Sequence, residues 1–144
     1  MKKLYFFLIL IISFGLFFKP AQVKAVPPTL FVKESQARMD KNETAYFDLK
    51  FVNMGVDVKK VIIKMNLVGP VELLEVEDFL EMEYSDLNLR RSSYQYQQIN
   101  DQTSIELIYQ PKNSGYYNAG SEEVTLARIK FKANQPGYAN LSIN

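Results

Sequence analysis

Hydrophobic and polar residues alternate with a period of two in two segments of this chain. In residues 44–52 and 61–67 every second residue is apolar, and the residues between them are mostly polar. The apolar positions are Ala45, Phe47, Leu49 and Phe51 in the first segment and Val61, Ile63, Met65 and Leu67 in the second. This alternation is typical of a β-strand with one buried face. Both segments are therefore predicted to be strands of a half-buried sheet.

Shorter strands are predicted elsewhere, separated by turn residues. They cover residues 29–32, 73–76, 92–99, 103–109, 124–131 and 139–143. Gly69-Pro70 and Asn53-Met54-Gly55 indicate turns, and Asn100-Asp101 predicts a hairpin. About eight short strands without a long helix predict an all-β fold, a jelly-roll or Ig-like antiparallel β-sandwich of about eight to nine strands.

Two segments are less regular. Residues 33–43 are polar and contain the turn signal Asp40-Lys41-Asn42, so no strand is predicted there. Residues 71–91 fit either a short strand followed by a loop or one amphipathic helix, and we favour the strand. Seven acidic residues lie between Glu72 and Asp86. We interpret them as a solvated edge rather than as a calcium site, because no Asp-x-Asp-x-Asp-Gly loop is present.

The first 25 residues have the pattern of a secretory signal peptide. A basic start, Met1-Lys2-Lys3, precedes an apolar run over residues 4–18 and the small-x-small motif Val23-Lys24-Ala25. The apolar run is shorter than the ~20 residues that a spanning helix needs. We therefore predict cleavage after Ala25, a secreted or cell-surface location, and no membrane span in the mature chain. Residues 26–144 are predicted to form one domain.

Composition narrows the possible chemistry. There is no Cys, so burial of apolar area and not disulfide bonding must stabilise this exported domain. There is no His, which removes the usual general base and the commonest zinc ligand. Removing residues 1–25 takes away four lysines and no acid, which leaves 13 basic against 16 acidic residues. Nucleic acid is therefore not an expected partner.

No cofactor or metal is predicted. Only six Gly are present, in no phosphate-binding pattern. Glycoside hydrolysis by two carboxylates is the one catalytic class that the composition allows. No motif sets out such a pair, so we expect a protein without catalytic activity.

Several segments together resemble the cohesin domain family. The resemblance in the opening part lies in Thr29-Leu30-Phe31-Val32, Lys41-Asn42-Glu43-Thr44 and Tyr46-Phe47-Asp48-Leu49. In the central part it lies in residues 61–67, Gly69-Pro70 and Leu73-Leu74-Glu75-Val76. The loop of residues 111–120, then residues 126–133, Gly137 and Leu141-Ser142-Ile143, resemble the closing segment of the family. Where the family has a Tyr-Asp-Pro turn, this chain keeps only the turn, at Gly69-Pro70.

The resemblance implies a noncatalytic extracellular module of the β-sandwich group that includes bacterial cellulose-binding modules. Such a module would bind a dockerin-bearing protein or a polysaccharide in polysaccharide degradation, or serve as a structural spacer in a surface protein. Cohesins continue through one further strand after the segment that ends here. We therefore expect an open sheet edge, completed by a further segment or by a partner strand.

Carbohydrate binding predicts a set of exposed tyrosines, because flat rings with a polar tip stack on sugars. The candidates are Tyr94, Tyr96, Tyr109, Tyr116 and Tyr117. Tyr94, Tyr96 and Tyr109 lie in predicted strands, and half-burial in a sheet is the favoured interpretation for them. Tyr116 and Tyr117 lie in a loop rich in Gly and Asn and are the better candidates.

Protein binding predicts a flat sheet face. Lys60, Ile62, Lys64 and Glu106 are the candidate partner residues, with Ile62 as an apolar anchor inside a polar rim. Without a partner, these polar positions are the solvent face of an antiparallel sheet.

Overall fold

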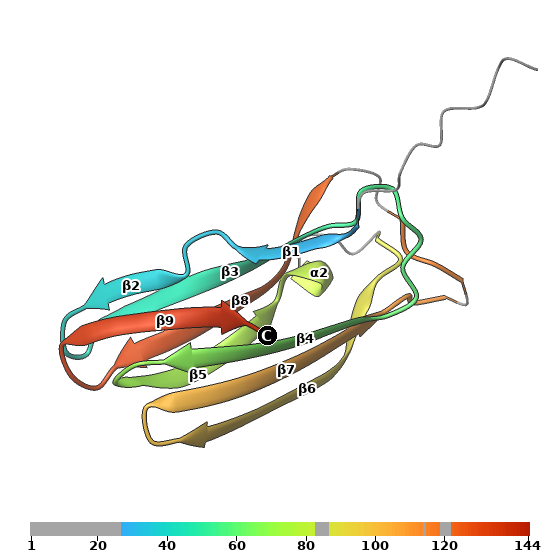
Figure 1. The fold of residues 1–144 in the computed structure, drawn as a ribbon. Coiled ribbons are helices and arrows are strands. Elements are labelled where there is room, and N and C mark those ends of the chain that lie inside the picture. Colours follow the sequence, from blue (N-terminus) through green and yellow to red (C-terminus); the bar gives the residue numbers. More distant parts are fainter. Residues whose placement is uncertain (1–26, 83–86, 114, 119–121) are drawn as a thin grey trace, which may run out of the picture.

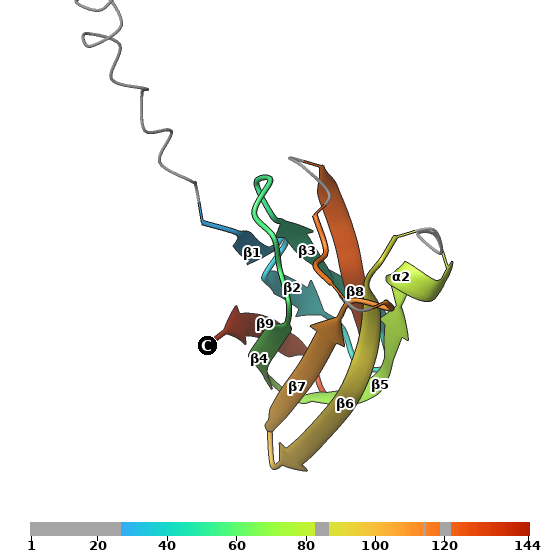
Figure 2. The same cartoon turned by 90° about the vertical axis from the view of Figure 1, so that its right-hand side faces the viewer.

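A computed structural model describes residues 27–82, 87–113, 115–118 and 122–144 of the chain. Within these residues nine strands form two antiparallel sheets that pack face to face (Figure 1; Figure 2). Sheet A has the order β1 (Thr29–Val32), β3 (Thr44–Val52), β8 (Glu123–Ala133) and β5 (Val71–Asp78). Sheet B has the order β2 (Gln36–Met39), β9 (Gly137–Ile143), β4 (Val61–Val68), β7 (Gln102–Gln110) and β6 (Arg90–Ile99). The predicted all-β sandwich is confirmed.

The core lies between the sheets and comes from the inward residues of each strand. Phe47 and Leu49 of β3 and Ile63 and Leu67 of β4 are almost completely buried, as their alternation predicts. Phe47 also packs on Phe131 of β8, with 4.7 Å between ring centroids. Burial of such side chains is the main stabilising contribution, since the chain has no cysteine.

The main difference from the predicted strands is β2, which occupies part of the polar segment 33–43. Its four residues pair with β9, from Gln36 opposite Asn140 to Met39 opposite Gly137. Met39 is its one fully buried apolar residue. The predicted turn follows it, with Asn42 at φ 68°.

The segment after β5 also differs in detail. β5 covers residues 71–78 and is longer than the predicted strand, residues 73–76. The short helix α2 (Phe79–Met82) follows it directly. Asp78 caps this helix, because its Oδ1 accepts a hydrogen bond of 3.2 Å from the Leu80 N–H. The strand interpretation is therefore correct for residues 71–78, and a single helical turn follows.

The predicted signal peptide lies outside the described residues, as do the acidic residues Glu83 and Asp86. Within the described part of the chain, no helix is long and apolar enough to cross a membrane.

Candidate functional site

The centre of the outer face of sheet B is made of polar residues in register. Lys64 of β4 lies opposite Glu106 of β7, which lies opposite Gln95 of β6. One step along, Asn66, Ser104 and Gln97 form the next row in the same way. The Ser104 hydroxyl donates a hydrogen bond of 3.0 Å to Asn66 Oδ1, and Lys64 Nζ lies 3.4 Å from Glu106 Oε2. These contacts hold the centre of the face as an ordered polar surface.

A shallow depression of about 560 Å³ lies over this centre. It is lined by residues of β4, β6 and β7 and by Asn144, and the outward side chains among them are Lys64, Asn66, Gln95, Gln97, Ser104 and Glu106. A second depression, of about 400 Å³, adjoins it at the β6–β7 turn. The two share Gln97 and Ser104, so the hollowed surface extends from the middle of the sheet to the hairpin.

Exposed apolar side chains flank these polar rows. Ile62 lies beyond one end, beside Ile108 on β7, and Val68 and Ile99 lie at the hairpin end. Tyr138 of β9 is exposed near the same end of the sheet. The face therefore has a polar centre between separate apolar positions.

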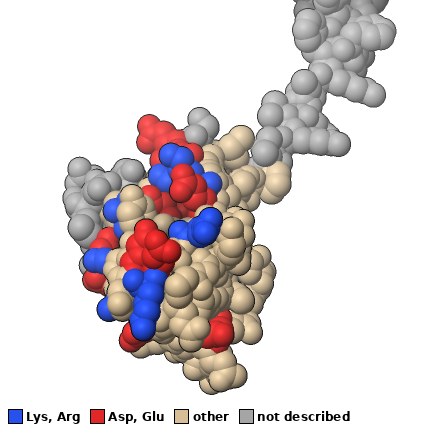
Figure 3. Space-filling view, turned by 90° about the vertical axis from the view of Figure 1, so that its left-hand side faces the viewer, with Lys and Arg blue, Asp and Glu red and all other residues tan. Residues whose placement is uncertain are grey.

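The outer face of sheet A has a different character, because charges of opposite sign oppose each other across its strands. Glu72 lies opposite Lys132, Glu75 opposite Lys130 and Glu77 opposite Arg128. Such cross-strand pairs stabilise a sheet. Three of the acids in the acid-rich segment are thereby accounted for as members of a charge ladder. Figure 3 views one end of the sandwich and shows acidic and basic side chains interleaved on the left and in the centre, with few charges on the right.

The four predicted partner residues come together on sheet B. Lys60 precedes β4 and is exposed, Ile62 and Lys64 follow on the same side of that strand, and Glu106 pairs with Lys64. Ile62 is 53% exposed, which suits the predicted anchor. Whether a partner uses these residues stays a prediction.

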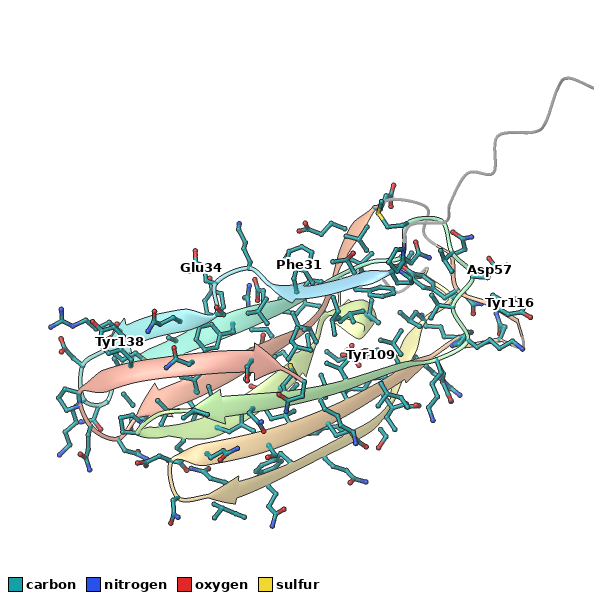
Figure 4. The ribbon with its side chains drawn as sticks, viewed as in Figure 1. Phe31, Glu34, Asp57, Tyr109, Tyr116 and Tyr138 are labelled. Carbon is teal, nitrogen blue, oxygen red and sulfur yellow. The ribbon has the colours of Figure 1, made fainter. Side chains whose placement is uncertain are left out.

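Two of the predicted sugar-stacking tyrosines are inside the molecule, so that role is corrected for them. Tyr109 lies between the sheets (Figure 4) with no exposed surface, and its hydroxyl donates a hydrogen bond of 3.1 Å to the Leu126 carbonyl. Tyr117 is 2% exposed and packs near Phe51 of the core. Its backbone forms an isolated bridge with Val58, which is also buried. Neither ring can stack on a sugar in this conformation.

Tyr94 and Tyr96 lie on edge strand β6, on the side that faces sheet A. Their rings stack with centroids 5.8 Å apart, and the Arg91 guanidinium lies 5.4 Å from the Tyr94 centroid. Burial, helped by Tyr96 and opposed by Arg91, raises the pKa of Tyr94 above its usual value. Tyr96 is exposed, and it is the more accessible ring of the pair.

Tyr116 lies at the end of the molecule formed by the loops (Figure 4), where its carbonyl accepts a hydrogen bond of 3.4 Å from Asn88, before β6 begins. Its ring is half exposed, with Lys59 Nζ 5.1 Å from the centroid. Asp57 is also at this end, and its Oδ1 accepts a hydrogen bond of 2.9 Å from Asn118. The two exposed members of the predicted set, Tyr96 and Tyr116, therefore lie at separate places and do not form one binding platform.

Sequence reasoning missed Val68, Ile99 and Tyr138 as surface residues of sheet B. Each continues the outward positions of a strand that was predicted correctly, so the alternation itself was the available signal. Among the described residues, no group of three or more acidic side chains could hold a metal ion.

No protein-family model matches the sequence, and no curated protein is significantly similar to it. A solved structure with a similar fold is described as the crystal structure of a complex between a CaDoc0917 variant and CaCohA2 at pH 5.5, a cohesin–dockerin complex. The match has 12% sequence identity and a TM-score of 0.51, and it covers 81% of this chain and 82% of that chain. The fold of this protein is therefore cohesin-like.

Proposed function

We propose that this protein is an exported, noncatalytic binding module whose sheet B outer face binds a protein partner of the dockerin type. The observation that carries the proposal is the difference between the two outer faces. On sheet A, acidic residues of β5 lie opposite basic residues of β8, whereas β4, β7 and β9 of sheet B together contain only Lys64 and Glu106 as charged residues. The cohesin-like fold supports the same kind of partner.

The energetics of such a face favour protein binding. Ile62, Val68 and Ile99 offer apolar area that a partner would remove from water, at about 25 cal/mol per Å². Asn, Gln and Ser side chains between them can exchange water for hydrogen bonds without the desolvation cost of buried charges. We infer that Ile62 is the anchor at one end of the face and that Lys60, Lys64 and Glu106 supply polar contacts beside it.

The absence of catalysis is proposed from the same surface. Glycoside hydrolysis needs two carboxyl groups on either side of the substrate. Among the described residues, Glu106 is the one acidic side chain that lines the central depression, and it is paired with Lys64. Export is proposed from residues 1–25, which have the pattern of a secretory signal peptide.

Calorimetric titration with a panel of dockerin-bearing proteins tests the proposed partner. The Ile62→Lys variant is expected to lose at least tenfold in affinity, because a charge replaces the anchor. Leu74→Lys is the matched control, since Leu74 is similarly exposed but lies on sheet A. Equal affinity of both variants would contradict the sheet B face, and failure of every dockerin to bind would contradict this class of partner.

Carbohydrate binding is the second candidate, and the exposed rings of Tyr96 and Tyr116 favour it. Affinity electrophoresis on soluble polysaccharides tests it with Tyr96→Ala and Tyr116→Ala made singly, which avoids disturbing the buried Tyr117. Loss of retardation in one variant would locate the sugar site. If the unchanged protein binds neither glycan nor dockerin, the role of a structural spacer is the supported one.

A further inference from the structure

The two sheets have four edge strands, which are β1 and β5 in sheet A and β2 and β6 in sheet B. An edge strand presents unpaired N–H and C=O groups, and proteins usually protect such edges with charges, bulges or covering segments. The described edges of this molecule differ in how far they are protected.

Three edges carry such protection. β5 has a bulge between Leu73 and Glu75 and contains four acidic residues. β6 has a bulge between Arg91 and Ser93 and begins with two arginines. β2 has four residues, as β1 has, but it contains the charged residue Arg38. By contrast β1 reads Thr-Leu-Phe-Val, with no charge and no bulge in its pairing with β3.

The free backbone groups of β1 can be assigned from its register. The Lys33 N–H donates to the Asp48 carbonyl at 3.4 Å, and Val32 pairs with Leu49. Along an antiparallel strand, successive residues direct their N–H and C=O groups alternately toward the paired strand and away from it. Lys33 points toward β3, so Leu30 and Val32 direct their N–H and C=O groups away from β3. Among the described residues, no strand pairs with this side of β1.

The core is only partly covered along the same side of the sandwich. Leu30 and Val32 of β1 are partly buried and pack against the core, and so are Val61 and Ile143 of sheet B. β1 contacts β9 here. Within the described chain, β9 pairs with β4 only over residues 65–68, so residues 61–63 of β4 have no strand neighbour on this side. Apolar residues of both sheets thus lie next to free backbone groups.

The opposite side, between β5 and β6, is closed by polar contacts. Arg91 lies 3.3 Å from Asp78 and donates a hydrogen bond of 2.8 Å to the Val76 carbonyl. Gln98 donates one of 3.2 Å to the Val71 carbonyl. These contacts join the two sheets where β5 and β6 end the layers. In the described part of the chain, no side-chain hydrogen bond or ion pair joins β1 to sheet B in this way.

We propose that the outer edge of β1 is a strand-addition site for an extended segment of a second polypeptide. The segment needs apolar residues at alternate positions, to cover the side chains beside Leu30 and Val32, and no charge within the paired run. Its length is set by the edge itself, because Pro28 precedes β1 and the charged Lys33 and Glu34 follow it. The site lies on sheet A, so it is independent of the partner proposed for sheet B.

Amide hydrogen exchange followed by NMR tests the site. The probe is the synthetic peptide acetyl-Lys-Val-Thr-Val-Thr-Val-Lys-amide. We expect it to slow exchange of the Leu30 and Val32 amides at least tenfold and to leave the Phe31 amide, which already pairs with β3, unchanged. Two versions of the peptide, N-methylated on alternate sets of amides, are the matched probes. One of them should bind and the other should not, because only one edge of the peptide faces β1.

A pair of protein variants separates backbone pairing from side-chain packing. Val32→Pro removes one outward N–H at an edge position where proline is tolerated, whereas Val32→Thr keeps the N–H and the shape. The proline variant should lose the peptide and the threonine variant should keep it. Binding that leaves the Leu30 and Val32 amides unprotected overturns the proposal, as does equal binding of both methylated peptides. Protection of these amides without peptide, in a monomer or in a dimer of this chain, also overturns it.

Discussion

Among the described residues, Tyr109 is the largest side chain that is fully buried. Its hydroxyl is satisfied by the Leu126 carbonyl, so the ring joins β7 to β8 across the core. Burial raises the pKa of Tyr109 well above its usual value, the nearby Asp78 carboxylate raises it further, and Arg91 opposes the shift. The phenol is therefore held in its neutral form.

This environment predicts an alkaline loss of stability. The unfolded chain releases the tyrosine proton near pH 10, whereas the folded chain retains it. The stabilisation is thus complete below pH ~10, and the free energy of unfolding should fall as the pH rises above it, by up to ~1.4 kcal/mol per pH unit. Urea denaturation between pH 8 and 11 measures this fall.

The Tyr109→Phe variant should flatten the fall and should cost about 1 kcal/mol at pH 7 through the lost hydrogen bond. Tyr94→Phe is the control, because Tyr94 is less buried and should change the alkaline slope less. A slope unchanged in Tyr109→Phe would contradict the prediction.

Arg128 shows a second local arrangement that depends on the shape of one side chain. Its Nε and Nη2 donate to the two oxygens of Asp48 at 2.8 and 3.1 Å, and the guanidinium lies 3.9 Å from the Tyr46 centroid and 4.7 Å from that of Phe79. The hydrogen bond to Asp48 raises the pKa of Arg128. The group therefore joins β3, β8 and α2 on the surface of sheet A.

Lysine cannot reproduce this planar, two-bond geometry. We expect Arg128→Lys to lower the free energy of unfolding by about 1 kcal/mol, measured by urea denaturation. Lys132→Arg, on the same strand, should leave stability within about 0.5 kcal/mol of the unchanged protein. Equal effects of the two substitutions would contradict a specific role for the guanidinium.

At the scale of the elements, the turn between β4 and β5 depends on a glycine. Gly69 has φ +142°, and a Cβ built there would overlap the Tyr138 carbonyl oxygen and lie 3.1 Å from the Ala139 Cα. Its N–H donates to the Asp101 carbonyl at 2.9 Å, so the turn also contacts the β6–β7 hairpin. The close approach of backbone from β9 leaves no room for a side chain.

Gly69→Ala is expected to destabilise the protein by about 3 kcal/mol, since it combines an unfavourable φ with a steric clash. Gly55→Ala is the matched control, because Gly55 also has a positive φ, +75°, but no atom lies within 4 Å of its added Cβ. We expect the control to cost about 1 kcal/mol. Thermal unfolding of both variants tests whether the clash adds to the backbone strain.

Strand identity was largely predictable from alternation, as β3 and β4 illustrate, because a period of two is a local property of the chain. β2 was not predictable in this way. It has four residues and one fully buried side chain, and its pairing of Gln36 with Asn140 depends on a strand about a hundred residues later in the sequence. Tyr117 was misassigned for a similar reason, and Tyr109 is fully buried where half-burial was the favoured interpretation, because only the packed sheets determine how much of a tyrosine is covered.

At the scale of the whole molecule, charge is distributed unequally between the two outer faces. The partner-face residues Lys60, Ile62, Lys64 and Glu106 could be proposed from the outward positions of predicted strands. The surrounding depression could not, because Gln95, Asn66 and Ser104 come from three strands whose order only the fold determines. The charges of Lys64 and Glu106 cancel, so the centre of the sheet B face has almost no net charge.

This distribution predicts weak salt dependence of partner binding. Raising the salt concentration from 0.1 to 0.5 M should change the affinity for a dockerin-type partner less than about threefold, since the one central ion pair is already satisfied within the face. Titrations at both concentrations measure this. A much larger change would indicate that the charged face of sheet A, and not sheet B, contacts the partner.

The way in which successive strands are divided between the two sheets affects how the chain folds. Of the connections between successive described strands, only β6–β7 joins neighbours in the same sheet, and every other one crosses from one sheet to the other. Neither sheet can then be completed before the other, and nearly all pairing brings together distant parts of the chain. Chains with this topology fold over milliseconds to seconds rather than microseconds. We expect the β6–β7 hairpin to be the first pairing to form and the remaining strands to associate in one cooperative step.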